Sequence, residues 1–562
     1  MEKTFKRLSL LPLVLLLIVR LTACDNDSNN DNNDAPQTLA VHDMAFELAD
    51  TSAITVHHFS LGALPLEGAT WDAESDVNST AYIPAPLDGI IAVPEGDGAH
   101  QLVLLLHGNT LTDGISDPVY AGFDFLVAQL AAEGYIAISI NIMVDYGFEF
   151  DVDGKIVTGE SMSHEWAYAL FNTHIEALEQ ANAGSVTAHG IDLTGRVLTE
   201  EIHLIGHSRG GMVADQFYRL DRDAGISRIR TIMRVGTMTQ IIDSPYEHPN
   251  IPLSILLAQF DGDVTLHPGQ VVFDQILAEA SNTSFAQITY LQGGNHNFFN
   301  RFFEEDDRIH VGGEDAALFL RHQDTWTTRQ EQEDFFKRYV VAFLGVATHQ
   351  ISPFSTFDST VAQPTSMFGF PVRASTYLPG SRRLEVAEQQ ASGQATVGEH
   401  VQRWGSGSLF VHPMMDPGTD ELTLTSLAWT GADGKITFTP QIKDFSGAQA
   451  LSFYLAVDSS DERNPAGESQ SFSLVLTDFS GKTQTLIIPP ETAALYFHVG
   501  EKNAPSEYLD FDTWNGTMPL GELRVPLSYF TNINLENIES ITFLFDQTPS
   551  GAIMLSDIFI TP

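Results

Sequence analysis

A serine at position 208 stands at the centre of the pentapeptide Gly206-His207-Ser208-Arg209-Gly210. A run typical of a buried strand precedes this pentapeptide, and a run typical of an amphipathic helix follows it. A serine held at so tight a strand-to-helix turn has a strained backbone, so the positions two before and two after it must be small. Glycine fills both positions. The Ser208 hydroxyl could therefore attack a carbonyl carbon, provided that the chain also supplies a base, an acid and donors for an oxyanion.

The base in such an arrangement is a histidine on a loop after a late strand. Among 19 histidines, His296 has this place, in "YLQGGNHNFFN", where Gly293 and Gly294 make the bend after a predicted strand. A surface histidine without a chemical role is the alternative for this position. We expect His203 to be an interior residue of the strand before Ser208, and His207 to pack beside the turn.

The acid should follow a strand that lies between the serine and the histidine in the chain, and "ILLAQFDGDV" offers two aspartates there. Asp261 leaves the predicted strand directly and is the first choice. Asp263 is the alternative acid, with a role in bracing the loop if Asp261 is the acid. Asp243, after the preceding strand, is a distant third candidate. The resulting order of serine, aspartate and histidine is the one expected for a nucleophile of this kind.

Two backbone N–H groups usually stabilise the oxyanion of an acyl-transfer reaction. The N–H of Arg209 follows the serine and lies at the N-terminus of the predicted helix, whose positive potential favours a developing negative charge. The second donor should come from the loop after an earlier strand, in "LLLHGNTLTDG", where the N–H of Asn109 or Thr110 is the candidate. We expect His107 to order this turn.

The elements that must position these residues alternate between apolar runs and amphipathic stretches from about residue 85 to 348. This alternation is typical of a mostly parallel sheet flanked by helices, an α/β fold. The predicted strands are 87–94, 101–108, 136–142, 201–206, 229–235, 252–261 and 286–292. The predicted helices are 123–135, 163–180, 210–220 and 331–345, and a hairpin is predicted at 149–159.

The segments "LLLHGNT", "AAEGYIAISIN", "LIGHSRGGM", "LLAQFDGDV" and "GGNHNFFN" together resemble the α/β-hydrolase superfamily over residues 85–348. The likeness is greatest to secreted bacterial serine esterases of the branch that includes chlorophyllases, dienelactone hydrolases and polyester hydrolases. A serine nucleophile distinguishes this chain from dienelactone hydrolases proper, which use a cysteine. The resemblance implies a catalytic α/β-hydrolase domain at 38–355 and a carboxylic ester hydrolase with a Ser-His-Asp acyl-enzyme mechanism, without a metal or cofactor.

Two other functions remain open at this point. The same fold supports peptidases or amidases, which differ in the leaving group and in the shape of the pocket. A glycan-binding surface protein with an inactive hydrolase domain is the third hypothesis. The loops that would line the pocket mix aromatic and acidic residues, so a small or polymeric ester with an apolar acyl part is expected, and anionic substrates are disfavoured.

Beyond about residue 365, the sequence consists of short segments in which apolar and polar residues alternate, separated by turn residues. Seven strand candidates predict an all-β sandwich: 435–440, 450–458, 471–478, 483–489, 522–530, 540–546 and 552–560. The pattern over 400–562 resembles the galactose-binding-like sandwiches, with 356–399 expected as an irregular linker. This resemblance implies possible contact with glycans through Trp404, Trp429, Tyr454, Tyr496 and Trp514, although core packing is the preferred reading of these aromatics. A structural calcium ion is a further possibility.

The N-terminal residues combine a basic start, an apolar run and the sequence Leu21-Thr22-Ala23-Cys24. They resemble a bacterial lipoprotein signal, with Arg20 as a departure, which implies a signal peptide at 1–23, lipidation of Cys24 and a flexible tether at 24–37. The chain would then be exported and anchored to a bacterial membrane, facing the periplasm or the cell surface. Its net charge of −45 argues against nucleic acid as a partner.

Overall fold

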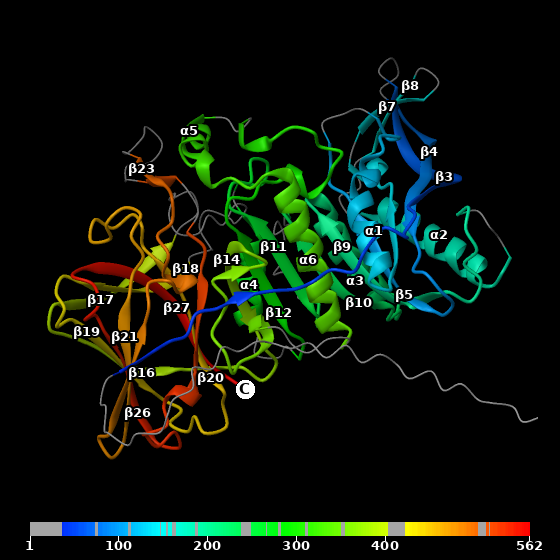
Figure 1. The fold of residues 1–562 in the computed structure, drawn as a ribbon. Coiled ribbons are helices and arrows are strands. Elements are labelled where there is room, and N and C mark those ends of the chain that lie inside the picture. The colour runs from blue at the N-terminus through cyan, green and yellow to red at the C-terminus, as the bar shows by residue number, and fades with distance from the viewer. Residues whose placement is uncertain are drawn as a thin grey trace, which may run out of the picture. The chain divides into compact units, whose positions relative to one another are not determined.

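Strand β9 (Val197–His207), which leads to Ser208, lies inside a large mixed sheet. In a computed structural model of the chain, the described strands of this sheet follow the order β2-β13-β14-β12-β11-β10-β9-β5-β6-β4-β3-β8-β7 (Figure 1). The structure describes residues 36–562 except for 73–76, 111–113, 147, 153–154, 160–163, 186–188, 238–248, 266, 279–282, 310–312, 350–354, 403–421, 504–512 and 516–517. Cys24, the signal peptide, Asp243 and Trp404 lie outside the described residues, as does the tether up to residue 35.

The middle of this sheet is parallel, as the alternating sequence pattern predicts. Strands β12, β11, β10, β9, β5 and β6 run parallel, and the antiparallel strands β14 and β4 flank them. The bounds are β4 Val77–Ala92, β5 His100–Leu106, β6 Ile136–Ile140, β10 Ile229–Val235, β11 Leu253–Ala258, β12 Ala286–Leu291 and β14 Phe370–Tyr377. The outer strands are β2 Asp43–Met44, β3 His57–Asp72, β7 Phe148–Val152, β8 Lys155–Gly159 and β13 Ser366–Met367.

The helices that the sequence predicts in this region are confirmed, and two more helices accompany them. Helices α1 (Asp124–Ala132), α2 (Glu165–Asn182), α3 (Arg209–Asp223) and α6 (Arg329–Ala347) match the predicted ranges closely. Helices α4 (Gly269–Ala278) and α5 (Gly313–Arg321) were not predicted. The hairpin expected at 149–159 is formed by the antiparallel strands β7 and β8.

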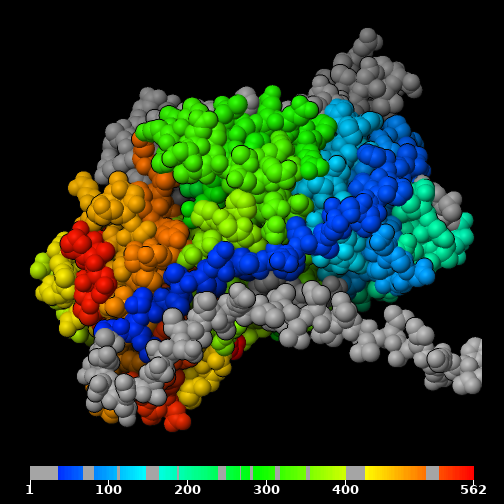
Figure 2. Space-filling view, in the orientation of Figure 1, coloured from blue at the N-terminus to red at the C-terminus, as the bar shows by residue number. Residues whose placement is uncertain are grey.

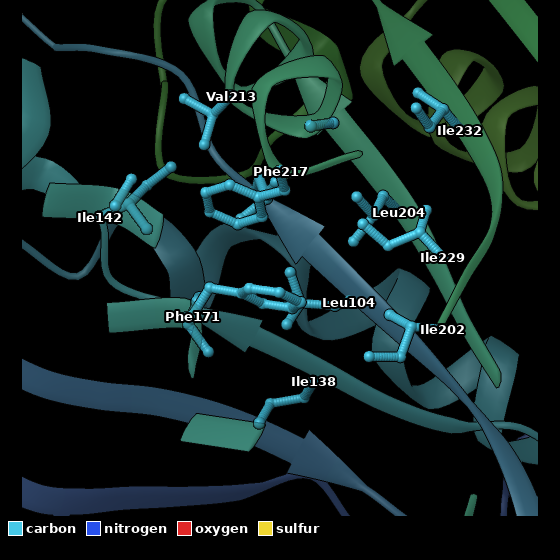
Figure 3. Packing of buried hydrophobic residues seen from close by; sticks show 14 of the residues in the cluster. Leu104, Ile138, Ile142, Phe171, Ile202, Leu204, Val213, Phe217, Ile229 and Ile232 are labelled. Atoms are coloured by element: carbon cyan, nitrogen blue, oxygen red, sulfur yellow. The ribbon is translucent and has the colours of Figure 1, made fainter. Parts of the chain in front are cut away.

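Both faces of the parallel sheet are buried beneath helices, which explains why its strands are almost continuously apolar. Alternate residues of β5 show the two-residue period: Leu102, Leu104 and Leu106 belong to one apolar core, whereas Val103 and Leu105 belong to another. The first core includes residues of α2, α3 and α4, and the second includes residues of α1 and α6. Figure 3 shows the first core, where the stacked rings of Phe171 and Phe217 lie beside the strands.

The C-terminal region contains two mainly antiparallel sheets, and all seven strands predicted there are present. Their described orders are β1-β22-β21-β26-β19-β16 and β17-β18-β27-β20-β25, with β15 paired to β27. A single apolar core contains residues of both sheets, as in a sandwich. The bounds are β1 Gln37–Thr38, β15 Arg382–Arg383, β16 Val386–Ser392, β17 Ala395–Gln402, β18 Leu422–Trp429, β19 Lys435–Pro440, β20 Ala450–Val457, β21 Phe472–Asp478, β22 Thr483–Ile488, β25 Gly521–Pro526, β26 Ile538–Leu544 and β27 Gly551–Thr561. A separate short pair is β23 Glu501–Asn503 with β24 Thr513–Asn515.

The segment 356–399, expected as an irregular linker, is instead largely strand. Strand β14 pairs antiparallel with β12 of the large sheet, β16 pairs with β19, and β17 pairs with β18. Residues of the segment are also buried, because β14 carries an almost unbroken apolar and small-residue face. The large sheet therefore ends well beyond residue 355, and the sandwich begins before residue 400.

Two of the aromatics considered for glycan contact lie in apolar interior positions. The Trp429 ring stacks on Phe545 with 4.0 Å between ring centroids, and both side chains are buried. Tyr454 is also buried, and its hydroxyl donates to the carbonyl of Thr376 at 2.6 Å. These two residues are core residues, as preferred from the sequence. The side chain of Trp514 lies outside the described set.

Buried polar side chains join the edge of the large sheet to the sandwich. The Thr376 N–H of β14 donates to Glu522 Oε2 at 2.9 Å, and Arg373 of β14 donates to the carbonyl of Ala493 at 3.1 Å. Glu522 in turn pairs with Arg524, and both side chains are fully buried. Separation of the two regions would take from the buried Glu522 carboxylate the N–H of Thr376 that it accepts.

Residues 37–56 form an extended N-terminal strap that contacts both regions, and Figure 2 shows it as a blue band across the surface. Strand β1 adds to the sandwich beside β22, and β2 adds to the large sheet beside β13. Farther along, the Ala49 N–H donates to Glu133 Oε1 at 2.7 Å. Gln37, assigned to the tether from the sequence, is thus part of a sheet.

Candidate active site

Ser208 has the strained backbone that its sequence context predicts, with φ of 56° and ψ of −126° between the end of β9 and the start of α3. Positive φ is unfavourable for a residue with a side chain, so the surrounding structure must hold it. A Cβ at Gly206 would lie 2.2 Å from the carbonyl oxygen of Gly210, and one at Gly210 would lie 2.3 Å from that of Leu106. The turn therefore requires glycine at both positions.

His296 and Asp261 form a buried ion pair at the carboxyl end of the parallel strands. The His296 Nδ1 lies 2.9 Å from Asp261 Oδ2, and both side chains are nearly inaccessible to solvent. Burial alone would lower the pKa of His296, but Asp261, Asp263 and Asp307 outweigh it and raise that pKa to about 9. Burial likewise opposes ionisation of Asp261, yet His296 holds the pKa of this carboxyl below its usual value.

Close contacts place this pair beside the serine. The Ser208 N–H donates to the carbonyl of Val235 at 2.8 Å, at the end of the neighbouring strand β10. Gly236 follows, and a Cβ added there would lie 3.0 Å from His296 Nδ1 and 3.3 Å from Asp261 Oδ2. Only a residue without a side chain allows the imidazole to approach this strand end. Within the described part of the chain, no hydrogen bond joins the Ser208 hydroxyl to His296, a bond that often tightens only when substrate binds.

The two aspartates of the acid loop have different places. Asp261 Oδ1 accepts the N–H groups of Asp263 at 3.1 Å and Val264 at 2.5 Å, so this carboxylate also fixes the loop that carries it. Asp263, the alternative acid, does not contact Nδ1. Its Oδ2 lies 3.4 Å from His296 Nε2, and its side chain is 66% exposed. The geometry therefore favours Asp261 as the partner that orients the imidazole.

Asp307 is a residue of this site that sequence reasoning missed. Its carboxylate accepts the N–H of Gly262 at 2.7 Å, of His296 at 3.1 Å and of Asn297 at 2.9 Å. It thus ties the acid loop to the histidine loop. Burial, followed by repulsion from Asp261, raises the pKa of Asp307. The acidic run "EEDD" shortly after His296 was the available signal, but only the folded chain shows which carboxylate turns inward.

His207 packs directly on the imidazole of His296, in agreement with its expected place beside the turn. The two rings lie 4.6 Å apart between centroids, and His207 Nε2 is 3.1 Å from the carbonyl oxygen of His296. Burial and the neighbouring His296 hold the pKa of His207 well below its usual value, so His207 stays neutral. Its Nε2–H can then donate to that carbonyl and hold the histidine loop in place.

The loop after β5 lies next to the serine. A Cβ at Gly108 would lie 3.2 Å from Ser208 Oγ, so this loop runs beside the hydroxyl. The Thr110 N–H donates to the Asn109 side chain at 2.8 Å, so it is the less favoured of the two candidate donors of this loop. The N–H groups of Asn109 and Arg209 donate to no acceptor among the described residues and remain the two candidates.

His107 orders this loop, as the sequence suggests. Its Nδ1 lies 2.8 Å from the carbonyl of Gly108, and its Nε2 accepts the N–H of Ile142 at 3.0 Å. The Tyr146 hydroxyl donates to the carbonyl of His107 at 2.5 Å. Burial lowers the pKa of His107 to about 4, so the ring is neutral and can accept a hydrogen bond. His203 lies inside the sheet next to Thr231, with 3.0 Å between Nδ1 and Oγ1.

The described residues contain neither a cluster suited to a metal ion nor a helix that could span a membrane. No group of three or more histidine, cysteine, aspartate or glutamate side chains is placed to hold a metal ion there. In the same residues, no helix combines the length and the apolar character needed to cross a bilayer.

Comparison with known proteins finds similarity among solved structures. No family model and no curated protein matches the sequence. Among solved structures, the chain is similar to one described as a putative dienelactone hydrolase from Klebsiella pneumoniae subsp. pneumoniae MGH 78578, with 14% identity and a TM-score of 0.26. The alignment covers 49% of this chain and 98% of that chain. The chain itself is a mixed α/β protein that combines a large, centrally parallel sheet with further β-sheets.

Proposed function

We propose that this protein is a serine hydrolase of the α/β-hydrolase fold that cleaves carboxylic esters. The observation that supports this most strongly is the position of a strained serine next to a buried aspartate–histidine pair. Ser208 lies at the carboxyl end of β9, and Gly236 at the end of β10 abuts His296 and Asp261. A structural serine would not need the positive φ that Ser208 adopts at this turn.

In the proposed reaction, His296 in its neutral form accepts the Ser208 proton at Nε2 while Oγ attacks the ester carbonyl carbon. The N–H groups of Asn109 and Arg209 stabilise the oxyanion, aided by the N-terminus of α3. Nε2 then gives the proton to the departing alkoxide as its C–O bond breaks. A water molecule, deprotonated by the same nitrogen, releases the acyl group as a carboxylate, and Asp261 holds the imidazole in the correct tautomer throughout.

We further infer that the reaction takes place outside the cytoplasm, with Cys24 as a lipid anchor. The support is the resemblance of residues 1–24 to a lipoprotein signal. Small or polymeric esters are the proposed substrates. No cofactor is invoked, and the strongly negative chain disfavours nucleic acid.

Hydrolysis of a p-nitrophenyl ester series of increasing acyl length by the full-length protein tests this function. Turnover should be abolished in Ser208→Ala, and a fluorophosphonate should label the wild-type protein at Ser208 and leave the variant unlabelled. The preferred acyl length would indicate the size of the pocket. Folded wild-type protein that neither turns over any ester nor reacts with the fluorophosphonate would disprove the proposal.

A further inference from the structure

The two aspartates of the acid loop contact opposite nitrogens of His296. Asp261 Oδ2 lies 2.9 Å from Nδ1, whereas Asp263 Oδ2 lies 3.4 Å from Nε2. Because Asp261 occupies Nδ1, Nε2 is the nitrogen left to exchange a proton with Ser208. Asp263 is thus on the reactive side of the imidazole, where a serine hydrolase usually has no carboxylate.

The place of Asp263 is fixed by its backbone and not by its side chain. Its N–H donates to Asp261 Oδ1 at 3.1 Å, and the preceding Gly262 N–H donates to Asp307 Oδ2 at 2.7 Å. The side chain of Asp263 is 66% exposed, against 1% for Asp261. The carboxylate can therefore change partners by rotation alone, while the loop beneath it stays in place.

The charges around His296 are mostly negative. Asp261, Asp263 and Asp307 face the ring of His296 and favour its protonated, imidazolium form. The ring that packs on His296 is that of His207. Of the three carboxylates, Asp263 is the one exposed to solvent. An imidazolium paired with Asp263 through Nε2 cannot accept the serine proton, so the free enzyme must lose that proton before it can react.

We propose that Asp263 pairs with His296 Nε2 in the free enzyme and, when substrate binds, turns to a positive charge on the alcohol part of the ester. The proposal rests on the serine hydrolase function inferred above. Since Nε2 protonates the departing alkoxide, a carboxylate next to Nε2 lies on the leaving-group side. Esters of cationic alcohols are then the favoured substrate class.

The proton balance of this step is complete. When the cationic group binds, the Asp263 carboxylate leaves His296 and pairs with that group. The Nε2 proton of His296 then passes to solvent. Neutral Nε2 next accepts the Ser208 proton as the Oγ–carbon bond forms, and it returns that proton to the alkoxide as the ester C–O bond breaks. The substrate cation thus replaces the imidazolium as the partner of Asp263.

A matched pair of esters tests the charge preference with the full-length protein. Acetylcholine and 3,3-dimethylbutyl acetate have nearly the same shape. The first carries a positively charged nitrogen where the second has a neutral carbon. We expect wild-type kcat/KM at pH 7 to favour the cationic ester by about tenfold. Asp263→Asn should bring the ratio to within about twofold, because the amide cannot pair with the cation. Glu304→Gln, which removes an exposed carboxylate beyond the histidine loop, should keep the wild-type ratio.

The pH dependence of kcat/KM on the neutral ester tests the pairing with His296. Asp263→Asn should move the rising limb to lower pH by about one unit, and Glu304→Gln should move it much less. Wild-type-like ratios in Asp263→Asn, or no preference for the cationic ester in wild-type protein, would overturn the substrate assignment. An unshifted rising limb in Asp263→Asn would overturn the pairing.

Failure of this proposal is distinguishable from failure of the proposed function. Loss of the serine hydrolase function would leave Ser208 unlabelled by fluorophosphonate in wild-type protein. Failure of the Asp263 proposal would leave that labelling intact. Thermal unfolding of each variant gives the control for folding, and the exposed Asp263 side chain should be replaceable without loss of structure.

Discussion

Two buried aspartate–histidine pairs lie among the described residues, and they differ in what surrounds the histidine. Asp261 and His296 are 2.9 Å apart after β11, and Asp145 and His164 are 2.6 Å apart after β6. Because β6 and β11 are parallel members of one sheet, both aspartates lie at its carboxyl edge.

The second pair has a structural role in the local fold. Asp145 Oδ1 accepts the N–H of Ala167 at 3.0 Å in the first turn of α2, and His164 is the residue that precedes this helix. His164 Nε2 is buried without a hydrogen-bond partner in the described part of the chain. His296 Nε2, by contrast, has the exposed carboxylate of Asp263 beside it. A buried aspartate–histidine pair is therefore not in itself a catalytic signature, because the second nitrogen of the imidazole decides what the pair can do.

Replacement of the two histidines should separate their roles most sharply. His296→Gln should lower kcat/KM for p-nitrophenyl esters by about ten-thousandfold, because the reaction loses the base proposed to accept the serine proton. His164→Gln should retain activity within about tenfold but lose roughly 3–5 kcal/mol of unfolding free energy, since Asp145 would stay buried without its partner. Ester kinetics and urea denaturation of both variants measure this. Equal losses of activity would show that both pairs take part in the reaction.

Replacement of the aspartate in each pair makes the same comparison, with a smaller expected loss of activity. Asp261→Asn should reduce kcat by about a thousandfold or more, because the amide can stabilise the wrong imidazole tautomer. Asp145→Asn keeps a hydrogen-bonding side chain next to α2 and should change kcat by less than about threefold. Steady-state kinetics at one pH, with circular dichroism as the folding control, give the answer. A stronger effect of Asp145→Asn on kcat would reverse the assignment of the two pairs.

The pH dependence of activity follows from the charge around His296. Its pKa is raised to about 9, so the imidazolium predominates at neutral pH. The base must be neutral, and kcat/KM should therefore rise about tenfold per pH unit from pH 7 and level off near pH 9. The sign for stability is opposite: the ion pair stabilises the fold fully below pH 6.5, and this contribution is lost as pH rises through about 9. A plateau reached already at pH 7 would contradict this protonation state.

Asp307→Asn should lower kcat far less than His296→Gln or Asp261→Asn. In the wild-type protein, the Asp307 carboxylate accepts hydrogen bonds from the N–H groups of Gly262, His296 and Asn297. In the variant, the side-chain amide nitrogen would face one of these N–H groups, and two donors cannot form a hydrogen bond. We expect a loss of about 1–3 kcal/mol of unfolding free energy and a fall in kcat of about tenfold, as the histidine loop loosens. His164→Gln provides the comparison, since it should lower stability with little change in kcat. An unchanged kcat in Asp307→Asn would show that Asp307 only stabilises the fold.

Local sequence was sufficient to select the residues that the structure brings together. The steric need for glycine at 206 and 210, and the apolar strands before Asp261 and Asn295-His296, are all readable within a few neighbouring residues. The sequence ranked Asp261 above Asp263, but it could not show which nitrogen of His296 each carboxylate contacts. Asp307 was missed for the same reason: its hydrogen-bond donors are backbone N–H groups of two other loops.

Prediction of the fold from local sequence has the same limit. Amphipathic periods located helices and the parallel strands, but β14 and β16 lie in a segment that was expected to be an irregular linker. Strand β14 forms because it pairs with β12 and contacts the sandwich. The spacing of apolar residues within β14 itself indicates neither interaction. Contacts between distant segments override local preference at such edges.

The N-terminal strap has a consequence for the order in which the chain can mature during synthesis. Gln37 emerges early, yet it pairs with Leu486, and Asp43 pairs with Ser366. The outer edges that the strap completes do not exist until those later residues have left the ribosome or the export channel. The first residues of the folded unit are therefore among the last to acquire their partners, and a ribosome-stalled chain ending before residue 486 should leave the strap open to protease.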